Sequence, residues 1–198
     1  MKTFKFLILV DLQNDFLEDC HSIGIFYPDQ DHHNVIIESV SVINSTDWDG
    51  IWITKDTHFS DYFTSLEGKI DNIEHCQYLS RGWEVNRKVM ESIANLQVTV
   101  ETVVKTTFGS YDLVQSIGQW FTSKCGPQFA DAFARGDNIE FHICGIHTSR
   151  SVLSNAVMLR AAYQNSTIVV HKNACADETG DLHNAALDVM RRQYCTIV

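Results

Sequence analysis

Polar residues that could carry acid–base or nucleophilic chemistry follow directly after apolar runs of the sequence. Asp11 follows the first run, Lys105 follows the third, and the fourth leads into the segment GIHTSRS at 145–151. Asp56 and His58 come shortly after the second run. Ligands of open α/β sheets bind outside the carboxyl ends of the strands. If the runs are neighbouring parallel strands, one sheet edge carries an acid, a pair of metal-ligating side chains, an amine and a hydroxyl.

Each of these residues also has a purely structural interpretation. An acid after a strand often caps a turn, and a Lys at the end of an apolar run is usually solvated. Asp56 and His58 could be surface residues. Thr148 is the expected N-cap of a helix whose first turn contains Ser151, where a Ser is commonly only a polar helix residue. Their convergence on one predicted edge favours a functional site.

Strand-like and helix-like segments alternate along the chain. Short runs rich in β-branched and aromatic residues predict strands at 4–10, 50–54, 98–104, 139–144, 166–171 and 194–198. Apolar residues at helical spacing lie between them, for example Leu113, Ile117 and Trp120. The alternation predicts an α/β protein with a doubly wound parallel β-sheet flanked by helices. A chain of 198 residues is expected to form a single domain, 1–198.

The stretch at 55–88 departs from this alternation. It is long, polar and aromatic, and its apolar residues show only weak periodicity. Loops of that size in compact domains are usually functional. We therefore expect this stretch to contribute to the site.

The charge balance excludes several kinds of partner. Fifteen Lys and Arg against 25 Asp and Glu give a net charge of −10 at pH 7, the wrong sign for binding nucleic acid or an anionic membrane surface. No apolar stretch approaches the roughly 18 residues of a membrane span. The six cysteines show no CxxC spacing and several lie in apolar runs, which predicts free thiols and a cytoplasmic location.

Six groups of short motifs resemble, in order, those of the isochorismatase-like cysteine hydrolases, and the nicotinamidases in particular. They are VDLQNDF at 10–16, TKDTH at 54–58, EHC at 74–76 with GWE at 82–84, KTTFGSY at 105–111, GIHT at 145–148, and Asp177 with HNAAL at 183–187. Together they span nearly the whole chain. The resemblance implies a doubly wound parallel sheet, a small-molecule substrate and assembly into a homo-oligomer.

The resemblance also implies catalytic roles for three residues. The Asp and Lys of the family's catalytic trio correspond to Asp11 and Lys105, and its Cys corresponds to Ser151. The family's Gly-x-x-Thr segment usually carries a cis peptide, which here would join Ile146 to His147. Backbone N–H groups near residues 147 and 151 would then bind a substrate oxygen as an oxyanion hole at a helix N-terminus.

Ser151 departs from the family pattern. A thiol with a pKa of about 8.5 becomes a thiolate beside a Lys and a helix N-terminus, whereas a Ser hydroxyl needs a base, here Asp11. Three explanations stay open: a replacement introduced to stop turnover, a natural enzyme that needs no nucleophile, or an inactive binding module. The second has a precedent in the isochorismatase branch, whose Asp acts as a general acid in vinyl-ether cleavage. Cys76 and Cys144 are poor substitutes, because one follows a candidate metal ligand and the other lies within a strand.

A divalent metal is the cofactor that the resemblance implies, and no organic cofactor is expected. Nicotinamidases have a matching Asp-x-His segment and His-Cys pair, and their metal receives the ring nitrogen of the substrate. The matching residues are Asp56, His58 and His75, one carboxylate and two imidazoles that suit Zn²⁺, Fe²⁺ or Mn²⁺. The family's additional His between His58 and His75 is missing. Either Asp61 replaces it, or the site is weaker or empty.

An aromatic substrate pocket completes the predicted site. Its expected walls are Phe16, Phe59, Trp83 and Phe108, although aromatic residues beside strands often belong to the core. The resemblance implies a hydrolase that cleaves the C–N bond of a small planar amide, as nicotinamidases do. A nucleophile-free vinyl-ether hydrolase and a catalytically inactive binding module are the alternatives.

Overall fold

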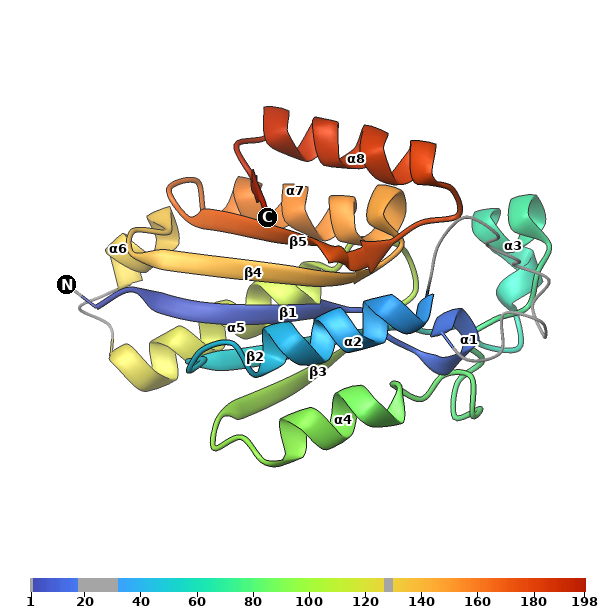
Figure 1. Ribbon diagram of the computed structural model, residues 1–198, viewed down its shortest axis with the longest axis horizontal. Helices are drawn as coiled ribbons and strands as arrows, with labels where there is room; N and C mark the ends of the chain where they lie inside the picture. Colours follow the sequence, from blue (N-terminus) through green and yellow to red (C-terminus); the bar gives the residue numbers. More distant parts are fainter. Residues whose placement is uncertain (1, 18–31, 127–129) are drawn as a thin grey trace.

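The computed structural model describes residues 2–17, 32–126 and 130–198 and contains one mainly buried sheet (Figure 1). The strand order is β3-β2-β1-β4-β5-β6, and all five neighbouring pairs are parallel. The strands are β1 (Phe4–Val10), β2 (Gly50–Asp56), β3 (Thr99–Lys105), β4 (Ile139–Ile146), β5 (Thr167–Ala176) and β6 (Thr196–Ile197). The predicted α/β class and the six predicted strands are confirmed.

Helices cover both faces of the sheet (Figure 1). One face packs against α5 (Tyr111–Cys125), α6 (Ala130–Arg135), α7 (Leu153–Ala162) and α8 (Gly180–Arg192), and the other against α1 (Asn14–Leu17), α2 (His32–Ile43) and α4 (Arg87–Ala94). Alternate side chains of β1 belong to the hydrophobic cores on opposite faces of the sheet. Phe6 and Ile8 are part of the core on the first face, and Leu7 and Leu9 are part of the core on the second. Strands buried on both faces therefore read as continuous apolar runs in the sequence.

The strand order reverses at the middle of the sheet. From β1 the chain proceeds to β2 and β3 on one side, and then crosses to β4, β5 and β6 on the other. Such a switch point leaves a crevice outside the carboxyl ends of the two central strands, which is where ligands bind in this type of sheet. Here β1 ends beside Asp11, and β4 leads into the turn that carries Ser151.

The stretch at 55–88 contains structure that the sequence pattern did not predict. A 3₁₀ turn, η1 (Tyr62–Thr64), precedes the short helix α3 (Leu66–Asp71). The hydroxyl of Ser65 caps α3 by accepting a hydrogen bond from the backbone N–H of Gly68 at 3.0 Å. Apolar periodicity could not reveal α3, because it has fewer than two turns and its Leu66 and Ile70 are exposed.

A π-helical turn, η3 (Thr148–Val152), connects β4 to α7. The prediction that Thr148 caps a helix is wrong. Its hydroxyl donates to the carbonyl oxygen of Ala176 at 3.0 Å, because the end of β5 lies within reach of this turn. The turn is therefore fixed to the neighbouring strand and places Ser151 above the switch point.

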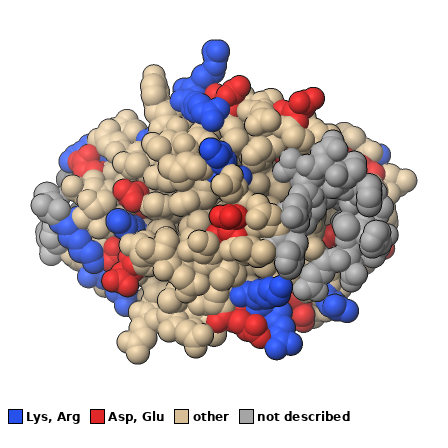
Figure 2. Space-filling view, in the orientation of Figure 1, with Lys and Arg blue, Asp and Glu red and all other residues tan. Residues whose placement is uncertain are grey.

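Charged side chains of both signs are interspersed on the face shown in Figure 2. Within the three described stretches, no helix combines the length and the apolar character needed to cross a membrane. Five of the six cysteines are free thiols, as predicted, and Cys20 lies outside the described residues.

Gly145 tests how closely β4 packs against β1. Its φ is +139°, and a Cβ built on it would lie 2.0 Å from the carbonyl oxygen of Val10. Gly145→Ala should therefore lower the free energy of unfolding by about 3 kcal/mol or more, measured by chemical denaturation. The matched control is Gly118→Ala in α5, where the nearest described atom outside the helix backbone is the Tyr163 hydroxyl oxygen at 3.8 Å from the added Cβ. This control should gain about 0.5–1 kcal/mol, and equal losses in both variants would contradict the prediction.

Candidate active site

Three strand ends bring together the acid, the amine and a second acid. The register pairs Asp56 of β2 with Lys105 of β3, and Asp11 follows the neighbouring end of β1. Lys105 Nζ lies 2.6 Å from Asp11 Oδ2 and 3.4 Å from Asp56 Oδ1. The same ammonium donates to Ser151 Oγ at 3.2 Å. The structure thus assembles Asp11, Lys105 and Ser151 into one buried constellation, with Asp56 beside it.

Burial and pairing together set the charges of these groups. Burial raises the pKa of Asp11, and Asp56 adds to this rise, against the opposing effect of Lys105. Burial disfavours the Lys105 ammonium, but the two carboxylates outweigh it and raise the pKa of Lys105. Burial also acts against ionised Asp56, but Lys105 and hydrogen bonds from His58 and His75 hold its pKa well below the usual range. Asp11 is therefore the carboxylate best suited to accept a proton.

Thr54 fixes the orientation of the Asp11 carboxylate. Asp11 has a positive φ of 51°, and its backbone N–H donates to the carbonyl oxygen of Thr54 at 3.2 Å. The Thr54 hydroxyl in turn donates to Asp11 Oδ1 at 2.6 Å. Because Oδ1 is occupied in this way, Oδ2 is the oxygen that meets Lys105.

The turn that carries Ser151 is fastened to the loop after β3. The peptide bond between Ile146 and His147 is cis, and the π-helical turn follows it. The side-chain amide of Asn155 donates to the carbonyl oxygens of Ser151 at 2.8 Å and of Phe108 at 3.1 Å. The Ser151 backbone and the loop behind Lys105 are therefore held by one side chain.

The last sequence motif supports the same turn from the other side. Because the Thr148 hydroxyl donates to Ala176, it accepts from Nδ1 of His183, 2.8 Å away. The backbone N–H of Ser149 donates to the Asp177 carboxylate. Asp177 and His183 thus position the turn.

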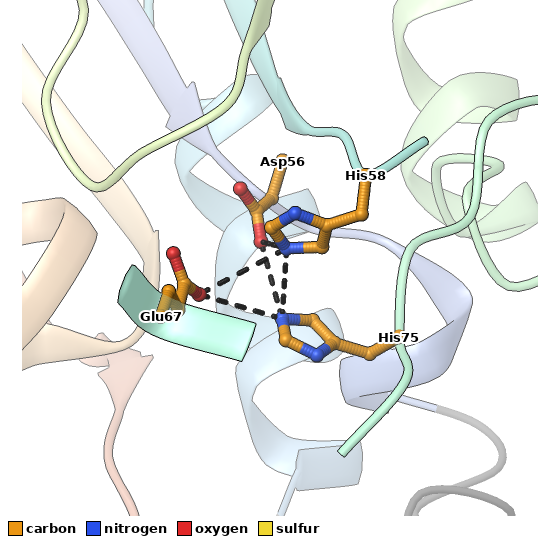
Figure 3. Close-up of side chains that lie close together, drawn as sticks. All are labelled: Asp56, His58, Glu67 and His75. Carbon is orange, nitrogen blue, oxygen red and sulfur yellow. Dashed lines mark hydrogen bonds and ion pairs between the residues drawn. The ribbon is translucent and has the colours of Figure 1, made fainter. Parts of the chain in front are cut away.

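Four side chains from the end of β2 and the segment after it form a second cluster (Figure 3). This cluster lies next to Lys105. One ligand atom each from Asp56, His58, Glu67 and His75 lies within 4.8 Å of the others. His58 Nε2 is 3.1 Å from both Asp56 Oδ2 and His75 Nε2, and His75 Nε2 is 3.4 Å from Asp56 Oδ2. Glu67 Oε1 is 3.8 Å from each of the two imidazole nitrogens. The four residues come from β2, the loops that follow it and α3.

The geometry and chemistry of this cluster fit a divalent transition metal. Ligand atoms about 2.1 Å from an ion and about 90–109° apart are separated by about 3.0–3.4 Å, the spacing among Asp56, His58 and His75. His75 Nδ1 lies 2.9 Å from the carbonyl oxygen of Ile73 and donates to it, which leaves Nε2 as the ring nitrogen that would bind an ion. Burial and the neighbouring Asp56 raise the pKa of Glu67, a cost that a cation would relieve.

Glu67 corrects the expectation that Asp61 replaces the missing family His. Asp61 precedes η1, and its carbonyl oxygen accepts from Thr64; its carboxylate is outside the cluster. Glu67 instead reaches the cluster from the first turn of α3. The only sequence signal for it is Ser65 followed by an acidic residue, a pattern typical of a helix start.

Gln13 is a second residue whose part in the site the sequence analysis missed. Its side-chain oxygen accepts from the backbone N–H of Asp56 at 2.7 Å, and its amide donates to the Asp56 carbonyl oxygen at 2.8 Å. The same amide donates to the carbonyl oxygen of Trp83 at 3.0 Å. Gln13 therefore holds the backbone of one candidate metal ligand from both sides.

A cavity of about 340 Å³ opens beside the metal-ligand cluster. Its walls are Leu66, Glu67, Ile70, Asp71, Thr107, Phe108 and Arg150. Glu67 belongs to the metal-ligand cluster, and Arg150 precedes Ser151. A small ligand in this cavity would therefore contact Glu67 of the metal-ligand cluster and the residue next to Ser151.

The four aromatic residues expected around the pocket occupy different places. Phe108 lines the cavity, and the buried Phe16 packs against the rings of His75 and His147, with centroid distances of 5.6 and 5.1 Å. Phe59 and Trp83 are not among the residues that line it. Both rings contact Tyr78, with centroid distances of 5.3 and 5.1 Å.

Solved structures of known proteins share this architecture, although comparisons of sequence find no match. No family model matches the sequence, and no curated protein matches it. Among solved structures, nicotinamidase/pyrazinamidase PncA from Bacillus subtilis has a TM-score of 0.73 and 20% identity, covering 100% of both chains. The yeast nicotinamidase Pnc1p, bound to the inhibitor nicotinaldehyde, has a TM-score of 0.69 and 15% identity, covering 98% of this chain and 99% of that one.

A third solved structure contains a metal. Pyrazinamidase of Pyrococcus horikoshii in complex with zinc has a TM-score of 0.64 and 17% identity, covering 98% of each chain. At these identities the likeness defines the fold. The chain shares its fold with these nicotinamidases and with an isochorismatase family protein from Desulfovibrio vulgaris.

The assignment of Glu67 to the metal-ligand cluster can be tested by zinc binding. Glu67→Gln keeps the size of the side chain but removes its charge, so the dissociation constant for zinc, measured by competition with a chromophoric chelator, should rise about tenfold or more. Asp61→Asn is the matched control and should bind zinc like the unmodified protein, because Asp61 lies outside the cluster. The reverse result would restore Asp61 as the ligand.

Proposed function

We propose that this chain, as a single domain over 1–198, is a metal-dependent hydrolase that cleaves the C–N bond of a small planar amide. The observation that carries the proposal is the contact of one ammonium, Lys105, with Asp11, Ser151 and the metal-ligand residue Asp56. This brings a base and a hydroxyl next to a candidate metal centre, and Glu67 of that centre lines the cavity. The fold shared with nicotinamidases supports the same class of reaction.

The first half of the proposed reaction uses Ser151 as the nucleophile. Its Oγ attacks the amide carbonyl carbon, and its proton passes to Asp11. Lys105 donates to this oxygen and stabilises negative charge in the transition state. The backbone N–H groups of His147 and Ser151 are the proposed donors to the carbonyl oxygen as it becomes an oxyanion.

The second half returns the enzyme to its starting state. Asp11 gives its proton to the leaving nitrogen, the C–N bond breaks, and ammonia departs from an acyl-enzyme ester. A water molecule then attacks the ester carbon and transfers a proton to Asp11, which passes it to Ser151 Oγ as the acid is released. A divalent ion held by Asp56, His58, Glu67 and His75 would supply a Lewis-acidic position for a ring nitrogen of the substrate.

The charges around the cavity favour an uncharged substrate. Its described walls include the acids Glu67 and Asp71 and one cation, Arg150. That cation forms ion pairs with Asp71 at 2.8 Å and with Glu178 at 3.0 Å. Its charge is therefore already balanced by two carboxylates, which disfavours an anionic isochorismate-type substrate relative to a neutral amide.

Ammonia release from nicotinamide tests the proposed activity. Ser151→Cys should raise the rate, because a thiol beside the Lys105 ammonium forms a thiolate more readily than a hydroxyl ionises. Asp11→Asn should lower the rate about 10²–10⁴-fold, because it removes the base. Circular dichroism of each variant controls for folding. If neither the Ser nor the Cys form releases ammonia from nicotinamide or related amides, amide hydrolysis is wrong.

The presence of Ser151 is the observation that keeps vinyl-ether hydrolysis as a second candidate. That reaction needs Asp11 as a general acid and no nucleophile, so Ser151→Ala should keep most activity on isochorismate while Asp11→Asn abolishes it. Amide hydrolysis through Ser151 predicts instead that Ser151→Ala is inactive on nicotinamide. Assaying Ser151→Ala and Asp11→Asn on both substrates distinguishes the two reactions from each other and from a catalytically inactive binding module.

A cytoplasmic location, a homo-oligomeric assembly and a small-molecule substrate remain part of the proposal. The solved neighbours bound to nicotinate and nicotinaldehyde support a small ligand. Zinc in the Pyrococcus pyrazinamidase supports a divalent metal, with iron and manganese as the other candidates.

A further inference from the structure

We propose that Arg150 is a positioning residue that fastens helix α3 to the turn after β4 and thereby holds Glu67 at the metal-ligand cluster. This deepens the proposed function and rests on its metal centre. The Arg150 guanidinium donates from Nη1 to Asp71 Oδ2 at 2.8 Å and forms an ion pair from Nη2 to Glu178 Oε1 at 3.0 Å. Its central carbon lies 5.5 Å from the centroid of the Phe108 ring. One planar group therefore joins α3 to the segments that follow β3 and β5.

Helix α3 benefits from such an anchor because, within the part of the chain that the structure describes, little apolar burial holds it in place. It is six residues long, and isolated helices of that length are not stable in water. The side chains of Leu66 and Ile70 are 75% and 70% exposed, and Gly68 is the buried residue of the helix. Apolar burial, the usual source of helix stability, therefore contributes little to α3.

The position of Asp71 also needs explanation. It is the last residue of α3, where the helix dipole disfavours a negative charge. The ion pair with Arg150 offsets this cost and makes Asp71 the fastening point at one end of the helix. Glu67 in the first turn reaches the two imidazoles at the other end.

The inferred chain of effects runs from Arg150 through Asp71 and α3 to Glu67. Without the ion pair, α3 should leave its native position more often, and Glu67 would spend less time near His58 and His75. Outer residues that orient metal ligands typically change metal affinity 10–100-fold when replaced. Because the Arg150 side chain is 34% exposed and its pairs are partly screened, we expect the lower end of that range.

The first experiment measures α3 directly in the metal-free protein. Hydrogen exchange of the backbone amides at 66–71 should be faster in Arg150→Gln than in the unmodified chain. The matched control is Arg191→Gln, which removes an Arg–Asp pair with Asp188 on α8 and should leave exchange at 66–71 unchanged. Asp71→Asn removes the same ion pair from the other side and should reproduce the effect of Arg150→Gln. Unchanged exchange in both Arg150→Gln and Asp71→Asn would overturn the proposal.

The second experiment asks whether the effect reaches the metal site through Glu67. The dissociation constant for zinc should rise about tenfold in Arg150→Gln, less in Arg150→Lys, which restores the positive charge, and not in Arg191→Gln. In a Glu67→Gln background, Arg150→Gln should cause no further change. An equal loss in both backgrounds would overturn the assignment of Arg150 as a residue that acts through Glu67.

These readouts do not depend on amide hydrolysis. If exchange and zinc affinity respond as expected while nicotinamide is not cleaved, the role of Arg150 stands and the proposed activity fails. If nicotinamide is cleaved while exchange at 66–71 and zinc affinity are the same in Arg150→Gln as in the unmodified chain, the role of Arg150 fails and the activity stands.

Discussion

The buried ammonium of Lys105 is the charge on which the rest of the site depends. Only 4% of this residue is exposed, and it lies between two buried carboxylates, Asp11 at 2.6 Å and Asp56 at 3.4 Å. An unpaired charge in such a place would be strongly destabilising, so each of the three groups requires the others. Asp56 meets Lys105 through Oδ1 and His58 through Oδ2. The nucleophile constellation and the metal-ligand cluster are therefore parts of one electrostatic unit, and a change in the charge of either alters the other.

The residues of the first motif build the framework around this unit. Gln13 extends β2 by pairing its amide with the Asp56 backbone, and the Asp15 carboxylate accepts the backbone N–H of Cys76 at 2.7 Å, next to His75. A Cβ at Gly82 would lie 2.0 Å from the Asp15 carboxylate, so a side chain at this position of the later Gly-Trp-Glu motif would displace that carboxylate. These residues hold the metal-ligand loops at fixed distances from Lys105.

The sheet and the residues at its edge can be predicted from the local sequence pattern. The structure within the long stretch at 55–88 cannot. Strands buried on both faces give continuous apolar runs, and a parallel sheet brings their carboxyl ends to one edge, so Asp11, Asp56 and Lys105 could be placed together without coordinates. Helix α3 has exposed apolar residues and fewer than two turns, and its position depends on contacts with distant segments. The local sequence pattern therefore gives little signal for Glu67. It predicts that Thr148 caps a helix, because the carbonyl oxygen to which its hydroxyl donates, at the end of β5, is remote in sequence.

The surroundings of Ser151 bear on the choice between an enzyme and an inactive binding module. Burial raises the pKa values of the Cys76 and Cys144 thiols well above their ordinary range, and both lie in the core, so neither is suited to replace the nucleophile. A buried ion pair such as that of Asp11 and Lys105 is weak evidence for stability, because apolar residues of similar volume often serve a core equally well. A binding module without activity would have no need for a proton acceptor, an ammonium and a hydroxyl in mutual contact. The mutual contact of these groups beside a metal-ligand cluster supports the proposed hydrolase over an inactive binding module.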